Sequence, residues 1–133
     1  MPPADRAALD QTKVLVQELE ALVKRGALTS PDRPDDVDAT EKCSVGEPAR
    51  RRVEALGDPE ATKLATDLRR LCAYDVPLVS ADHALKQLSL SPSQASRRLM
   101  CGIAAKDLDT ARAAKNADRR LRDIDARWAH SCK

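Results

Sequence analysis

Apolar residues recur every three or four positions along most of the chain, which is the period of an amphipathic α-helix. The clearest run predicts a helix over residues 5–25, with Asp5 as its N-cap and Gly26 just beyond its end. Its predicted inward face consists of two neighbouring columns of side chains. The first column contains Ala8, Thr12, Leu15, Leu19 and Leu22, and the second contains Leu9, Val16 and Val23.

The next segment is the least regular and predicts a loop over residues 27–46, with room for a short helical turn near residues 37–43. Two prolines, Pro31 and Pro34, and a series of acidic residues mark it as an exposed connection. Pro48 follows this segment and predicts the first residue of the next helix, because proline lacks the N–H that an inner helical turn needs.

Turn and capping residues divide the middle of the chain into two further helices. Asp58 and Pro59 predict the N-cap and the first residue of the first one, and the sequence Asp75-Val76-Pro77 predicts its end. Ser80 predicts the N-cap of a short helix that ends before the turn beginning at Ser89.

The C-terminal segment, residues 92–131, has no proline after Pro92 and a single glycine, Gly102. Its apolar positions step by three or four, so we expect one long helix that bends at Gly102. Together the segments predict a single all-α domain over residues 1–133. We expect an up-down-up helical bundle with one short extra helix at one end.

Composition agrees with a helical fold. The chain contains 22 Ala and 16 Leu but no Phe, and only ten residues are Val or Ile. This mixture favours helices over a β-sandwich or a barrel. No apolar run approaches the length of a membrane span. The net charge is +2, which is too small to indicate nucleic-acid binding by itself, although residues 97–133 alone carry +5.

Four cysteines, Cys43, Cys72, Cys101 and Cys132, are the most informative residues for function. An even number in a small chain predicts two disulfides, and disulfides place a protein in an oxidising, extracytoplasmic compartment. The alternative is four reduced thiols in a cytoplasmic protein. No Cys-x-x-Cys pair is present, so the usual signatures of a structural zinc site and of a thioredoxin-type redox site are absent.

The predicted long helix leads to a prediction of disulfide pairing. Cys101 and Cys132 would lie about 46 Å apart in a continuous helix, whereas the two Cα atoms of a disulfide lie within about 7 Å. This excludes a Cys101–Cys132 bond and with it Cys43–Cys72. The up-down-up layout favours Cys72–Cys101 and Cys43–Cys132 instead.

One stretch, from Ala84 to Leu99, resembles the helix-turn-helix of lactose-repressor-type regulators over about 20 of the 133 residues. The likeness is best from Ser91 onward, where Ser-Pro-Ser precedes a Ser-Arg pair and a leucine. The resemblance implies that Ala95 and Leu99 are buried. It also implies that a set of polar residues faces DNA, namely Ser91, Ser93, Gln94, Arg97 and Arg98.

The chain offers little for catalysis or metal binding. Its two histidines, His83 and His130, belong to no complete constellation, and no glycine-rich phosphate loop is present. We therefore expect no catalytic residue, no metal site and no cofactor. The sequence favours a non-enzymatic, disulfide-stapled helical domain of an exported protein that is structural or binds a protein partner. The alternative is a cytoplasmic DNA-binding protein that uses about residues 80–101.

Overall fold

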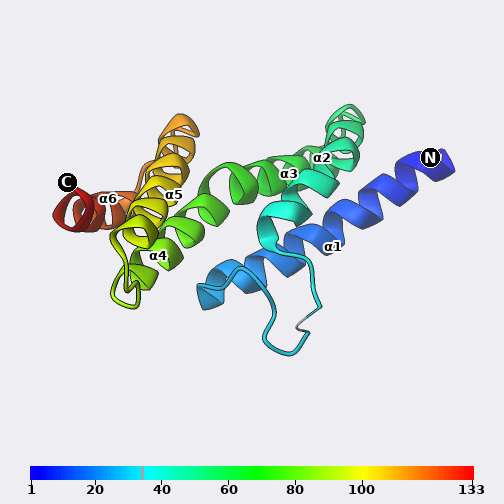
Figure 1. Cartoon of the computed structure of the whole chain (residues 1–133). Coiled ribbons are helices and arrows are strands. Elements are labelled where there is room, and N and C mark those ends of the chain that lie inside the picture. The colour runs from blue at the N-terminus through cyan, green and yellow to red at the C-terminus, as the bar shows by residue number, and fades with distance from the viewer. Residues whose placement is uncertain (34) are drawn as a thin grey trace. The chain divides into compact units, whose positions relative to one another are not determined.

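The computed structural model describes residues 1–33 and 35–133, and these residues form the all-α structure that the sequence predicts. Pro34, within the predicted loop, lies outside the described residues. The α-helices in Figure 1 are α1 (Pro3–Arg25), α2 (Ala39–Glu54), α3 (Pro59–Arg70), α4 (Val76–Leu88), α5 (Gln94–Ala113) and α6 (Arg119–Cys132). A short π-helical segment, η1 (Leu71–Asp75), stands between α3 and α4.

The described chain divides into two compact units, Met1–Cys72 and Ala73–Lys133. In the first unit α1, α2 and α3 each contact the other two, and in the second unit α4, α5 and α6 do the same. Each unit is therefore a small three-helix bundle. That residues 1–133 form a single domain stays a prediction.

Helix α1 forms largely as its apolar pattern predicts. Leu19 is fully buried, and the buried hydroxyl of Thr12 donates a hydrogen bond to the Ala8 carbonyl at 2.8 Å. Gly26 ends the helix with φ of 66°, a left-handed conformation that glycine adopts at little cost. The prediction that Asp5 caps α1 is wrong, because the helix begins two residues earlier and Pro2 is its N-cap.

Helix α2 begins inside the predicted loop, so the expected range of 27–46 is too long. Asp38 is the N-cap, and its carboxylate accepts a hydrogen bond from the Thr40 N–H at 2.8 Å. Pro48 lies inside α2 rather than at its start. Buried Ala49 and Val53 continue the helix beyond the proline, because the packing of this face outweighs one lost backbone hydrogen bond.

The cap predicted at Asp58 is confirmed, since its carboxylate accepts a hydrogen bond from the Ala61 N–H at 2.9 Å. The predicted end at Asp75-Val76-Pro77 is wrong, because η1 leads directly into α4. Pro77 stands in the first turn of α4, where its missing N–H is tolerated. Ser80 consequently lies inside α4 and is not an N-cap.

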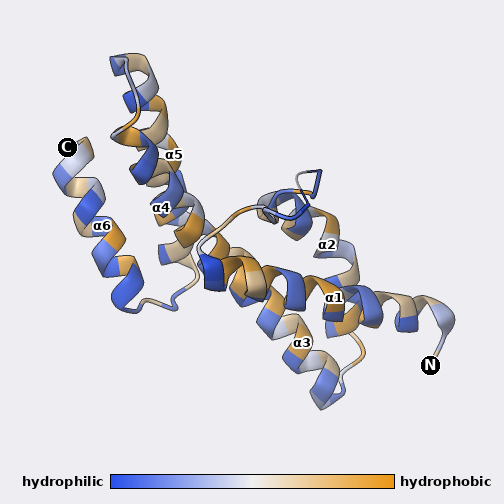
Figure 2. Cartoon of the chain, turned by 90° about the horizontal axis from the view of Figure 1, so that it is seen from below, coloured by the Kyte–Doolittle hydropathy of each residue, from blue (hydrophilic) through white to orange (hydrophobic). Residues whose placement is uncertain are grey.

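The predicted single helix over residues 92–131 is wrong, because residues 114–118 separate α5 from α6. Lys115 has φ of 58°, which reverses the chain, and Asp118 caps α6 by accepting a hydrogen bond from the Arg120 N–H. At Gly102, where we expected a bend, α5 runs on uninterrupted. Helix α6 is largely hydrophilic in Figure 2, and its buried apolar residues are Leu121 and Ile124.

Candidate functional site

Two disulfides close the two units separately. Cys43 bonds Cys72 in the first unit and Cys101 bonds Cys132 in the second, with Cα–Cα distances of 5.6 Å and 5.7 Å. The predicted pairs Cys72–Cys101 and Cys43–Cys132 are therefore wrong. The break between α5 and α6 is the reason, because it lets α6 return beside α5. The first bond thus joins α2 to η1, directly after α3, and the second joins α5 to the last residue of α6.

A buried tyrosine anchors the start of α6. Tyr74 is completely buried, and its hydroxyl donates to the Asp118 carboxylate at 2.7 Å and accepts from the Asp118 N–H at 3.0 Å. The guanidinium of Arg120 lies 5.4 Å from the centre of the Tyr74 ring and donates to Asp75 at 2.7 Å. The Tyr74 hydrogen bond and those from Arg120 outweigh burial and lower the pKa of Asp118 to about 2.

The residues that the helix-turn-helix resemblance assigns to DNA lie in the turn after α4 and in the first turns of α5. Ser93 is the N-cap of α5, and the Ser91 hydroxyl donates to the Gln87 carbonyl at 2.9 Å. Arg97 donates to the Leu88 carbonyl at 2.9 Å, so it satisfies the C-terminal end of α4. Gln94 and Arg98 are exposed.

The resemblance also implies two buried positions on α5, and both are exposed in the structure. Leu99 exposes 59% of its surface, and Ala95 is exposed as well. Ile103, one turn beyond Leu99, is 39% exposed. The buried face of α5 is formed instead by Ala104, Leu108 and Ala111. The expectation that Ala95 and Leu99 face the core is therefore wrong.

These exposed side chains form an outward stripe along α5, which we call the α5 face. It consists of residues at helical spacing, namely Ala95, Leu99, Gly102, Ile103, Lys106 and Thr110, and all of them are exposed. Lys106 on the face and Arg98 beside it form no salt bridge within the described part of the chain. The α5 face is therefore apolar at its centre and positively charged at its edge.

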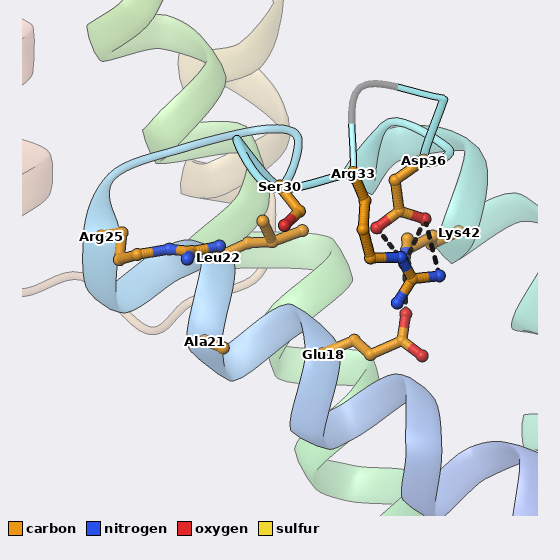
Figure 3. A pocket seen from close by; sticks show the side chains of 8 residues that line it. All are labelled: Glu18, Ala21, Leu22, Arg25, Ser30, Arg33, Asp36 and Lys42. Carbon is orange, nitrogen blue, oxygen red and sulfur yellow. Dashed lines mark hydrogen bonds and ion pairs between the residues drawn. The ribbon is translucent and has the colours of Figure 1, made fainter.

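A small polar pocket lies in the first unit, between α1, the segment that follows it and the start of α2 (Figure 3). Lys42 forms its wall with a side chain that is only 8% exposed, and its ammonium group pairs with Glu18 and, at 3.2 Å, with Asp36. Burial opposes the charged form of Lys42, but the two carboxylates outweigh it and raise its pKa. The hydrogen bond from Lys42 lowers the pKa of Asp36.

One carboxylate in the second unit lacks a full set of partners. The Oδ2 atom of Asp107 is buried and has no hydrogen-bond partner among the described residues. Burial raises the pKa of Asp107, against smaller opposing effects of the Ser80 hydroxyl and of Lys106. This residue interacts with Ser80 of α4, and its unpartnered buried oxygen opposes the packing of α4 on α5.

Both histidines lie at the surface. His83 and His130 are exposed, and the sulfur of Cys132 near His130 is bonded to Cys101. Within residues 1–33 and 35–133, no three His, Cys, Asp or Glu side chains are placed to hold a metal ion. None of the described helices is sufficiently long and apolar to cross a membrane.

Comparison of the chain with protein-family models, with curated proteins and with solved structures gave no match. The function is therefore inferred from the geometry of this chain alone. Sequence reasoning missed both the α5 face and the polar pocket. Asp118 was the available signal for the helix break, because an aspartate before a run of helix-forming residues is a common N-cap.

Proposed function

We propose that this chain is a non-enzymatic, disulfide-stapled helical module that works in an oxidising, extracytoplasmic compartment and binds a protein partner. The main support is the state of the cysteines, since all four are paired within their own units. Each of the two small bundles has a modest core, because the chain contains no phenylalanine. Cross-links that restrict the unfolded chain add stability to such a fold where the environment preserves them.

The α5 face is the surface that best supports partner binding. Exposed Leu99 and Ile103 lie one turn apart on one helix, which is the spacing with which helices contact each other. Arg98 and Lys106 lie beside them without a salt bridge, and Ala73–Lys133 contains eleven Lys and Arg against seven Asp and Glu. This charge favours a partner with an acidic amphipathic helix whose apolar side covers Leu99 and Ile103.

The binding proposal is tested with two synthetic helical peptides of identical apolar pattern, one with glutamates and one with lysines on its flanks. Fluorescence anisotropy should show that the oxidised protein binds the acidic peptide. Leu99→Asp should weaken this binding at least tenfold, whereas Val45→Asp, at a site on α2 that is 65% exposed, should leave it unchanged. Equal binding of both peptides, or no effect of Leu99→Asp, would refute the proposal.

The DNA-binding alternative is supported by one observation, the pairing of α4 and α5 across the short turn at residues 89–93. Its test is titration of the protein with duplex DNA at increasing salt. Binding that weakens steeply with salt and depends on Arg98 would support it. The exposed apolar centre of the α5 face favours a protein partner over a phosphate backbone.

The compartment is tested on protein isolated from its native source after rapid alkylation of free thiols. We expect no alkylated cysteine before reduction and four after it. Alkylation of the unreduced protein would indicate a reducing compartment and would contradict this part of the proposal.

A further inference from the structure

The polar pocket of the first unit contains a positively charged group that its own carboxylates do not pair with. Lys42 donates to Glu18 and Asp36. Arg33 lies 3.8 Å from Asp36, which is an ion pair but is longer than a hydrogen bond. Arg25 forms no salt bridge within the described residues. The side chains that line the pocket therefore carry three positive charges and two negative charges.

The arrangement of these groups suits a small, negatively charged ligand. In Figure 3, Arg25 and Ser30 lie on one side of the pocket and Arg33 on the other, above Glu18. Leu22, only 3% exposed, supplies an apolar floor. Guanidinium groups bind carboxylate and phosphate through two parallel hydrogen bonds, and a serine hydroxyl can donate one more.

Behind these groups Lys42, Glu18 and Asp36 form an ion triad that joins α1 to α2 and to the connecting segment. The side chains of Lys42 and Asp36 are 8% and 11% exposed, whereas that of Glu18 is 33% exposed. The Leu28 carbonyl also accepts a hydrogen bond from the Ala39 N–H at 2.9 Å, which holds the two ends of this segment together. The pocket wall is thus in place before any ligand binds.

The pocket is small and open to solvent on one side. Its volume is about 120 Å³. A phosphate group or a small carboxylate fits this space. We propose that the pocket binds a small oxyanion, a phosphate or a carboxylate, between Arg25 and Arg33 with the Ser30 hydroxyl as a further donor.

The experiment uses the full oxidised chain and two probes, inorganic phosphate and acetate, with sodium chloride at equal ionic strength as the reference. Amide chemical shifts in ¹⁵N-labelled protein should move in a saturable manner around residues 18–42 with at least one probe. The probe that binds more tightly identifies the preferred headgroup. Chemical shifts that follow ionic strength alone, with no difference from chloride, would overturn the proposal.

Variants separate this site from general attraction of anions. Arg25→Gln and Arg33→Gln should each weaken binding roughly tenfold, because each removes a charge-assisted hydrogen-bond pair. Lys24→Gln removes an exposed cation from the same turn that does not line the pocket, and it should leave the affinity unchanged. Equal losses in all three variants would contradict the site. The outcome is independent of the α5 face, which lies in the other unit.

Discussion

Replacement of Tyr74 by phenylalanine should destabilise the second unit through the start of α6. The Tyr74 hydroxyl makes both a donated and an accepted hydrogen bond with Asp118, and Phe keeps the buried ring but loses both. A hydrogen bond to a charged group contributes about 1.5–3 kcal/mol when buried. The Asp118 side chain is 39% exposed. Solvent screening therefore reduces the expected loss to about 1–1.5 kcal/mol.

The same change should alter the dependence of stability on pH. The pKa of Asp118 is about 2 in the folded protein and lies below the ordinary value of 3.8. Because the pKa of Asp118 is lower in the folded protein than in the unfolded chain, its charged form stabilises the fold at pH values above about 4. This stability is lost as the pH falls from about 4 through about 2. Tyr74→Phe removes the largest cause of this depression, so the variant should lose less stability than the parent protein across that interval.

Urea unfolding measures both effects, with the fluorescence of Trp128, the single tryptophan, as a probe of the second unit. Asp118→Asn is the matched control, because asparagine still caps a helix but carries no charge. It should remove the part of the pH dependence that Asp118 contributes while retaining part of the stability at pH 7. Equal stability of Tyr74→Phe and the parent at pH 7, with the same loss on acidification, would refute this account of the α6 anchor.

Three further substitutions test other parts of the packing. Lys42→Met should lower the free energy of unfolding by about 2 kcal/mol, because it leaves two carboxylates without their buried cation. Denaturant unfolding monitored by circular dichroism measures this change, and an unchanged midpoint would contradict the role of the triad. Gly46→Ala should lower the free energy of unfolding by about 1–3 kcal/mol, since its Cβ would lie 2.5 Å from Leu15 Cδ1. Gly102→Ala is the control, because its Cβ meets no atom within 4 Å and the variant should be as stable as the parent. Asp107→Asn should stabilise the protein by up to about 1 kcal/mol at pH 7, because burial raises the pKa of Asp107 and disfavours its charged form. The gain should disappear at acidic pH, where Asp107 is protonated. A variant that is less stable than the parent at pH 7 would show that the charged form is favoured.

The elements that could be predicted from sequence are those with a strong local signal. The apolar columns of α1, its stop at Gly26 and the cap at Asp58 each follow from short-range chemistry. The structure confirms them, apart from Val23, which is only half-buried. Pro48 and Pro77 gave wrong helix boundaries, because each is tolerated where the surrounding helix gains enough from burial.

The disulfide pairing could not be predicted once the break after Ala113 was missed. The turn at residues 114–118 contains neither glycine nor proline, and Lys115 adopts a left-handed conformation that lysine seldom takes. What holds the turn is a contact 44 positions away along the chain, between Tyr74 and Asp118. A periodic pattern of apolar residues carries no information about such a contact, so the pattern alone extended α5 into α6.

Both the fold and the proposed function require that each unit is closed by its own disulfide. Proteolysis of the unreduced protein followed by mass spectrometry of the linked peptides tests this claim. The structure predicts one peptide pair that joins Cys43 to Cys72 and another that joins Cys101 to Cys132. Peptides that join Cys72 to Cys101, or Cys43 to Cys132, would contradict it.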